Sequence, residues 1–239
     1  MATYGLYLES GPRRRKTMVH VLQILGCVAV GPTTDDALAA TPEAIRAYLR
    51  FLDRCGEKVD LDAPIETQIV EHITEGIWLG NGSPYILYGP DLEPVTDAEM
   101  QTFVGRHLRL REELATWAES LSDEALDAVP AGGGRTARAI LLHVIGPTGP
   151  YLSASLGTAP GFGRWHGKAE RGEVPLSVAL RETAQMAADR LLNTTPEERR
   201  AIREREAGRR TLRQSIRRLL EHDWEHLAEL SRRPGGPTI

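Results

Sequence analysis

The feature that most constrains this chain is a change in its hydrophobic pattern close to Thr96. Before it, short apolar runs alternate with polar residues and are separated by turns containing glycine and proline, a pattern typical of strands. After it, apolar residues recur every three or four positions over long segments, which is typical of helices. A chain of 239 residues can form two such units, each with its own core. We therefore expect an α+β domain at residues 1–92 and an all-α domain at residues 93–239.

The N-terminal domain is predicted to combine a small antiparallel sheet with one helix. We expect strands at residues 3–9, 17–23, 27–30, 65–78 and 85–88. The first two form a hairpin whose tip carries the basic stretch Arg13 to Lys16, and an Asn81-Gly82 turn joins the last two. Between them, Thr33 caps a helix that continues to about Arg54, with Asp36 at the capping-box position.

The C-terminal domain is predicted to be a four-helix bundle, because long segments of helical periodicity alternate with loops. We place its helices at residues 97–119, 134–146, 175–193 and 211–231, with a short helical turn near 196–206. The glycine-rich stretches 131–134 and 157–172 are expected to be loops, and 234–239 a frayed tail. Pro147 is expected to kink the second helix, because it lacks the N–H that would bond the carbonyl of His143.

The composition argues against several classes of protein. A formal net charge of -4 favours neither a nucleic-acid-binding protein nor an acidic tail. The chain opens without a basic leader and apolar run, and no segment has the apolar length of a membrane span, so we expect a cytoplasmic protein without membrane contact. Cys27 and Cys55 do not form a CxxC pair. Any metal must therefore be held by nitrogen and oxygen atoms.

Two histidines near the C-terminus are spaced to share a metal. His222 and His226 are four residues apart in a helical segment, so their imidazoles stack on one face. In a helical projection, His226 lies at the edge of the apolar sector and His222 lies just beyond that edge. Glu225 points to solvent. Asp223 falls inside the apolar sector, and because a buried carboxylate needs a partner, it is a candidate for orienting an imidazole or a bound water. Alone, such a pair is more often ordinary surface chemistry.

A third histidine strengthens the metal hypothesis. His143 interrupts the apolar run 139–145, so we expect it in the middle of the bundle, where something must satisfy its imidazole. One alternative is a hydrogen bond to a backbone carbonyl, and the other is a metal shared with His222 and His226. Three imidazoles leave a coordination position open, as in sites that bind water or substrate. Zn²⁺, Ni²⁺ and Mn²⁺ all accept such ligands, so the residues do not choose among them.

Most other histidines and the arginines of residues 199–218 are interpreted as surface groups. The histidines are His20, His72, His107 and His166. Of these, only His166, with its neighbour Trp165, is kept as a candidate, because a glycine-rich loop at the mouth of a bundle can form a lid. The arginines alternate with glutamates at spacings that allow ion pairs along a solvated helix, so no nucleic-acid partner is expected.

The order of these features resembles the DinB/YfiT-like superfamily of bacterial four-helix bundles. In that superfamily, a histidine of the second helix and an HxxxH pair of a later helix bind a metal, and His143, His222 and His226 stand at those positions. The resemblance covers about residues 97–233. Relatives include transferases and isomerases that use low-molecular-weight thiols, which implies a metal that activates a thiol or a water. Asp223 would then take or relay the proton.

The N-terminal part resembles a HicB-type antitoxin domain. The matching residues are Leu25-Gly26-Cys27, Gly31, Thr33, Asp36-Ala37 and Glu43-Ala44-Ile45. Such antitoxins usually add a DNA-binding module, but a helical bundle stands in its place here, so repression of transcription is not implied. We expect this domain to bind a partner or to support the bundle.

Two classes of function remain open. The first is a metal-dependent enzyme, a thiol transferase or a hydrolase, that acts on a small molecule. The second is a non-catalytic binding or stress-response module, in which the HicB-like domain recognises a protein or ligand. A homodimer formed through exposed helical faces is compatible with either class. The metal content of the purified protein distinguishes the two classes, because only the enzyme requires a bound ion.

Overall fold

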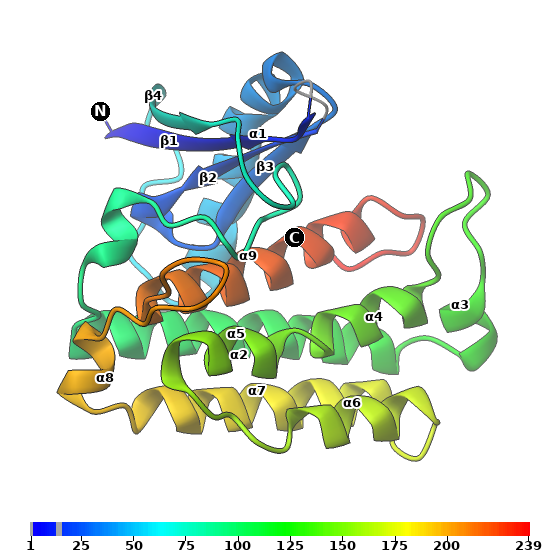
Figure 1. Cartoon of the computed structure of the whole chain (residues 1–239). Coiled ribbons are helices and arrows are strands. Elements are labelled where there is room, and N and C mark those ends of the chain that lie inside the picture. Colours follow the sequence, from blue (N-terminus) through cyan, green and yellow to red (C-terminus); the bar gives the residue numbers. More distant parts are fainter. Residues whose placement is uncertain (1, 13–15) are drawn as a thin grey trace.

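The N-terminal residues form a four-stranded sheet with one long helix against it, in a computed structural model that describes residues 2–12 and 16–239 (Figure 1). The elements are β1 (Ala2–Ser10), β2 (Thr17–Val21), β3 (Cys27–Gly31), α1 (Thr34–Arg54) and β4 (Ile65–Ile73). The strand order is β3-β2-β1-β4, in which β2 is antiparallel to both neighbours and β4 is parallel to β1. The sheet is therefore mixed, and the expectation of a purely antiparallel sheet was wrong. A parallel partner needs a crossover, and α1 lies in that connection.

The hairpin tip predicted at Arg13 to Lys16 lies outside the described residues, except for Lys16. Two strand predictions for this unit were wrong. The strand expected at 65–78 ends at Ile73, and 85–88 is not a strand but part of a loop that leads into the 3-10 helix η3 (Gly89–Leu92). In this loop, backbone groups bond to side chains instead of a neighbouring strand: Gly82 and Ser83 donate to Glu9, and the carbonyl of Ile86 accepts from α9.

The C-terminal part is all-helical, as predicted. The four expected helices are α2 (Asp97–Glu119), α4 (Ala137–Ile145), α7 (Leu176–Leu192) and α9 (Leu212–Ser231), and the short one is α8 (Pro196–Arg200). The structure adds α3 (Asp123–Asp127), α5 (Thr148–Leu156) and α6 (Phe162–Glu170). Helix α6 lies where a loop was expected. The kink predicted at Pro147 is a break, because α4 ends at Ile145 and α5 begins at Thr148.

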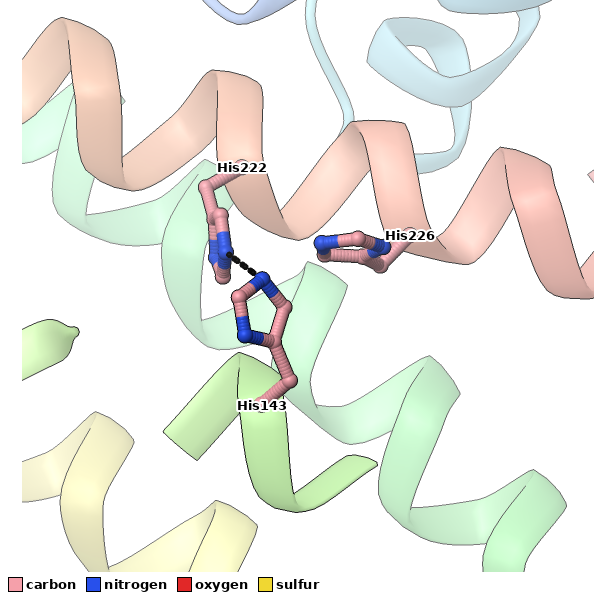
Figure 2. Close-up of side chains that lie close together, drawn as sticks. All are labelled: His143, His222 and His226. Carbon is pink, nitrogen blue, oxygen red and sulfur yellow. Dashed lines mark hydrogen bonds between the residues drawn. The ribbon is translucent and has the colours of Figure 1, made fainter. Parts of the chain in front are cut away.

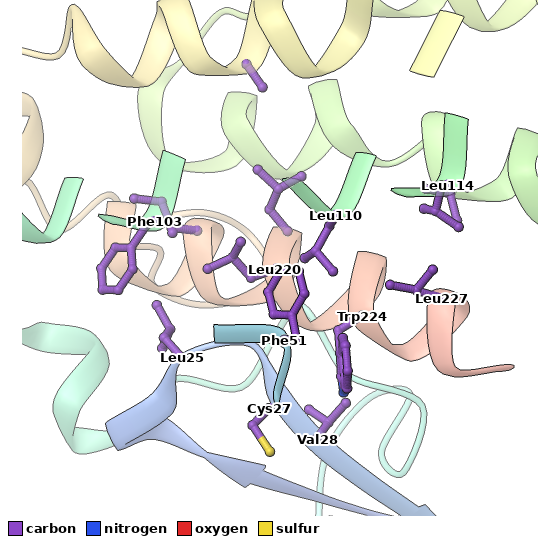
Figure 3. Packing of buried hydrophobic residues seen from close by; sticks show 14 of the residues in the cluster. Leu25, Cys27, Val28, Phe51, Phe103, Leu110, Leu114, Leu220, Trp224 and Leu227 are labelled. Atoms are coloured by element: carbon purple, nitrogen blue, oxygen red, sulfur yellow. The ribbon is translucent and has the colours of Figure 1, made fainter. Parts of the chain in front are cut away.

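One apolar core joins the two parts. Helix α9 lies between the sheet unit and the rest of the bundle, and it contacts β3 on one side and α2 and α5 on the other (Figure 1). Trp224 of α9 packs edge-on against Tyr48, with ring centroids 4.9 Å apart. Its ring centroid lies 5.4 Å from that of Phe51, which Figure 3 shows beside it. The same cluster continues into α2 through Phe103 and Leu110. Because the core is continuous, the domain boundary at residue 92 stays a prediction.

Among the described residues, no helix combines the length and the apolar character needed to cross a membrane.

Candidate metal centre

Two capped helices position the three histidines. Helix α4 begins after Thr136, whose hydroxyl accepts the N–H of Ala139, and carries His143 in its last turn. Helix α9 begins after Thr211, which accepts the N–H of Gln214. A capped start fixes the helix register, and it therefore fixes the direction in which the side chains leave the helix.

The three imidazoles converge on one point, as Figure 2 shows. One nitrogen from each of His143, His222 and His226 lies within 4.8 Å of the others. The Nε2 atoms of His143 and His222 are 3.1 Å apart, and the ring centroids of His222 and His226 are 4.6 Å apart. Nitrogens that share a tetrahedral ion at about 2.0–2.1 Å lie about 3.3 Å from one another. The three rings thus need only small rotations to hold one ion.

The protonation state of the histidine rings suits the binding of a metal cation. Burial lowers the pKa of His222 to about 3, and partial burial together with the charge of His226 lowers that of His143 to about 4. Both rings are therefore neutral at pH 7, and each offers a lone pair. Two neutral nitrogens 3.1 Å apart repel unless a proton or a metal lies between them. His143, which we expected inside the bundle, lies at its exposed edge.

His226 is oriented by a carboxylate on its own helix. Its Nδ1 lies 2.8 Å from Glu229 Oε2, which directs Nε2 toward the other two rings. Arg135 donates to the same oxygen at 2.8 Å, and Arg233 lies 3.5 Å from the other. Burial raises the pKa of Glu229. The hydrogen bond with His226 and the charges of Arg135 and Arg233 outweigh burial and bring this pKa down to about 2. Glu229 is thus a permanent acceptor for Nδ1–H.

Asp223 is buried, as its place in the helical projection predicts, but it does not line the adjoining cavity. Arg111 donates to its Oδ2 at 2.6 Å, and His107 Nδ1 lies 3.0 Å from the same atom. Its Oδ1 lies 3.9 Å from Nδ1 of His222. Burial raises its pKa, but the charge of Arg111 together with the contacts to His107 and His222 outweighs burial and holds the pKa well below its usual range. Such a carboxylate is a weak base, so the geometry favours the orienting role over the proton relay.

A cavity of about 660 Å³ opens beside the histidines. His143 and His222 line it, and its other lining residues come from both parts of the chain. The loop between β4 and η3, residues 74–88, which we call the N-terminal loop, contributes Trp78 and Tyr85, and α5 contributes Tyr151. The same wall includes His166, now on helix α6, but not Trp165.

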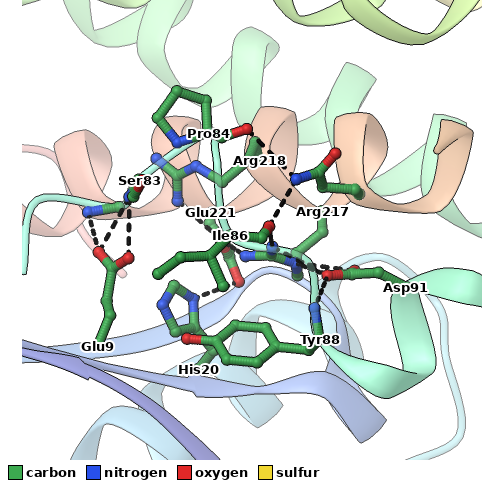
Figure 4. A network of polar contacts seen from close by, with 12 residues as sticks. Glu9, His20, Ser83, Pro84, Ile86, Tyr88, Asp91, Arg217, Arg218 and Glu221 are labelled. Atoms are coloured by element: carbon green, nitrogen blue, oxygen red, sulfur yellow. Dashed lines mark hydrogen bonds and ion pairs between the residues drawn. The ribbon is translucent and has the colours of Figure 1, made fainter. Parts of the chain in front are cut away.

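A buried polar network fastens the N-terminal loop to α9 (Figure 4). Arg217 donates to Asp91 at 2.9 Å, to Glu221 at 3.1 Å and to the carbonyl of Ile86 at 3.1 Å. Gln214 donates to the same carbonyl. On the other side, Glu221 lies 2.8 Å from Nδ1 of His20 on the sheet. The loop that walls the cavity is therefore held against the helix that carries His222 and His226.

These contacts correct two predictions. His20 and His107, interpreted as surface groups, are both buried. Arg217 and Arg218, interpreted as part of a solvated face, are buried as well and pair with Asp91 and Glu221. In both cases a second element covers a helix or strand face that the local pattern leaves open to solvent.

The fold and the site together define a class: a helical bundle with three histidines, from two helices, that could hold one metal ion. Residues 106–230, more than half of the chain, match the family model of the DinB superfamily. The chain belongs to the DinB superfamily. The N-terminal sheet unit receives no family assignment, and its likeness to HicB is unsupported. No curated protein and no solved structure matches the chain.

The sequence interpretation found the three histidines but missed what surrounds them. Glu229 stands three residues after His226, a helical spacing that could have revealed it. Arg111 and the cavity residue Trp78 gave no local signal, because they reach the site only through the packing of separate elements.

Proposed function

We propose that this chain is a metal-dependent enzyme in which His143, His222 and His226 hold one divalent ion next to the substrate cavity. The observation that carries the proposal is the convergence of three imidazole nitrogens within 4.8 Å, at the end of a cavity of about 660 Å³. Three protein ligands leave a coordination position for a substrate, whereas a purely structural site is closed by four. Imidazole suits Zn²⁺, Ni²⁺ and Mn²⁺, and the donor set does not separate them.

A divalent ion in this site supplies Lewis acidity, which lowers the pKa of a thiol or a water that reaches it. Glu229 keeps the Nδ1 proton of His226 in place, so that Nε2 faces the site. Asp223 acts on His222 from the buried side and limits the rotation of that ring, while Arg111 fixes Asp223 in turn. We propose transfer or hydrolysis of a small molecule as the reaction, with a low-molecular-weight thiol as one candidate substrate.

Metal analysis of the protein purified without a histidine tag tests this proposal. We expect about one divalent ion per chain, and a loss of most of it in His222→Ala and His226→Ala. His166→Ala is the matched control, because His166 lines the same cavity but is not one of the three converging residues. A protein that holds no divalent ion, or three variants with equal metal content, would refute the proposal.

A second candidate function is a non-catalytic binding module. The exposed edge strand β4 favours it, because Ile69 and Val70 are 48% and 56% exposed there and an edge strand can pair with a strand of another protein. In this version the N-terminal sheet unit recognises a protein partner, and the bundle performs no chemistry. A metal-free protein whose sedimentation shows self-association or complex formation, lost in Val70→Lys, would favour this candidate over the enzyme.

The partner predictions remain proposals. We propose no nucleic-acid partner, which is supported by the internal ion pairs of Arg213, Arg217 and Arg218 with carboxylates of the same chain. Electrophoretic retention of DNA at physiological salt would contradict it. A homodimer is tested by sedimentation of the purified protein.

A further inference from the structure

The cavity beside the histidines carries an unbalanced positive charge. Among the described residues that line it there is no aspartate or glutamate, whereas Arg210 and Arg218 both face it. Arg218 has a counterion, because its Nη1 donates to Glu221 at 2.7 Å. The charge that remains uncompensated is therefore that of Arg210.

Arg210 is buried without an acidic partner. Only 6% of it is exposed, and its guanidinium donates to the backbone carbonyls of Arg209 at 2.7 Å and Ala207 at 3.2 Å. In the described part of the chain, no carboxylate lies within ion-pair distance of it. A buried cation is costly unless an anion accompanies it, and burial accordingly lowers the pKa of Arg210. The planar guanidinium is the group that best binds a carboxylate or a phosphate.

The wall next to Arg210 is aromatic and comes from the N-terminal loop. The guanidinium carbon of Arg210 lies 5.0 Å from the ring centroid of Tyr85, which in turn packs edge-on against Trp78 at 5.6 Å. Trp78 is 66% exposed and has a φ of 59°, an uncommon conformation for a bulky residue. Strained backbone clusters at ligand-binding sites, and here it presents the aromatic group at the cavity wall.

Hydrogen bonds hold the loop that carries Trp78 and Tyr85 in one conformation. The buried carboxylate of Glu9 accepts the backbone N–H groups of Gly82 and Ser83, and the Ser83 hydroxyl donates to the carbonyl of Ile77 at 2.6 Å. Figure 4 shows Glu9 directly beneath the backbone at Ser83. The aromatic wall is thus built into the fold before any ligand arrives.

The cavity is elongated along α9. Gln214, Arg218 and His222 are spaced by four residues, share one face of the helix and all line the cavity. Arg210 stands just before this helix, and the ten helical steps from Leu212 to His222 span about 15 Å. The unpaired cation and the histidines therefore lie at opposite ends of one cavity.

We infer that this cavity binds an elongated organic anion, with its carboxylate or phosphate group on Arg210 and its apolar or aromatic body against Trp78 and Tyr85. The reactive end of the ligand lies at His143 and His222. Placing the reactive end there rests on the proposed function, but the contact with Arg210 does not require a metal. The N-terminal unit is then a substrate-binding part of the site, and its role is to select the ligand.

Four probes that share one apolar body test this inference: 4-phenylbutyrate, 4-phenylbutyl phosphate, 4-phenylbutanol and 4-phenylbutylamine. Isothermal titration of the full-length, untagged protein gives their affinities, before and after removal of metal with a chelator. We expect at least one of the two anions to bind at least about tenfold more tightly than the alcohol in both conditions, because a charge-assisted hydrogen bond contributes that much. The amine should bind more weakly than the alcohol, and the tighter of the two anions identifies the preferred group.

Variants assign the effect to residues. Arg210→Gln should remove the preference for the anion and leave the alcohol unchanged, whereas the exposed neighbour in Arg209→Gln is the matched control and should change neither. Trp78→Gly, which tolerates the positive φ, should weaken all probes by similar factors. If Arg210→Gln does not fold, the probe comparison on the unmutated protein decides alone.

Several results would overturn the inference. These are equal binding of anions and alcohol, no saturable binding of either anion, a preference for the amine, an anion preference that disappears with the metal, and an unchanged preference in a folded Arg210→Gln. A protein that holds no divalent ion as purified and still prefers the anions would refute the proposed function and support this inference.

Discussion

Replacing Arg111 with methionine is expected to lower the free energy of unfolding by about 3–5 kcal/mol, the usual cost of leaving a buried charge without its partner. Arg111 is 1% exposed and donates to Asp223 at 2.6 Å, to the carbonyl of Val144 at 2.9 Å and to the hydroxyl of Thr148 at 2.8 Å. Methionine fills much of the same space but leaves the fully buried carboxylate uncompensated. Domains are stable by about 5–15 kcal/mol, so the loss is a large share of the total.

The loss should also depend on pH, because His107 lies 3.0 Å from the same carboxylate oxygen. Burial lowers the pKa of His107 in the natural protein, and the charge of Arg111 lowers it further. In the variant, the charge of Arg111 is gone and the unpaired carboxylate favours the protonated ring, so we expect the pKa of His107 to rise above the unfolded value of about 6.5 and His107 to serve as the replacement cation. That contribution is present below pH about 6.5 and is lost as pH rises through the folded pKa. The variant should therefore be more destabilised at pH 8 than at pH 5.5.

Urea unfolding followed by tryptophan fluorescence measures both effects. Arg181→Met is the matched control: its pairs with Glu112 and Glu119 are exposed, so it should cost less than about 1 kcal/mol. The double variant Arg111→Met/Asp223→Leu should recover most of the loss, because an apolar pair can replace a buried ion pair. A loss below about 1 kcal/mol in Arg111→Met, or a double variant as unstable as the single one, would show that Arg111 is not the cation that stabilises buried Asp223.

Three further outcomes follow from the structure. Thr211→Ala removes the cap of α9 and should cost about 1–2 kcal/mol in urea unfolding, whereas Thr211→Ser should cost much less. Gly26→Ala should destabilise more than Gly56→Ala, since both glycines have positive φ but a Cβ at Gly26 would lie 2.1 Å from the Tyr48 hydroxyl; equal midpoints would contradict this. The hydrogen bond from Arg213 lowers the pKa of Glu99 from 4.5 to about 2, so its stabilisation is present above pH 4.5 and lost as pH falls toward 2. Because Glu99 is 37% exposed, Glu99→Gln should cost at most about 1 kcal/mol at pH 7 and flatten the acid limb of the Tm profile; an unchanged profile would count against it.

The hydrophobic periodicity of the sequence predicted the helices and the positions of site residues on one helix. The four-residue spacing of His222 and His226 and the helical projection of Asp223 required only a regular helix, and α9 is one from Leu212 to Ser231. The bundle followed from the same periodicity. The convergence of His143 with this pair was predicted from the resemblance to a family, and the structure brings the three together.

The remaining features depend on contacts between distant segments. The parallel pairing of β4 with β1 joins residues about sixty positions apart, which no local pattern specifies. Arg217 looked solvent-facing because the sequence does not show that the N-terminal loop covers α9. The cavity itself was missed for the same reason, since its aromatic wall at Trp78 belongs to the other part of the chain.

X-ray absorption at the edge of the bound metal, on protein purified without a tag, tests the central claim most directly. We expect one divalent ion per chain with three imidazole nitrogens at about 2.0–2.1 Å and at least one further light-atom ligand. An ion surrounded only by oxygen atoms, or a spectrum with fewer than three imidazoles, would contradict it.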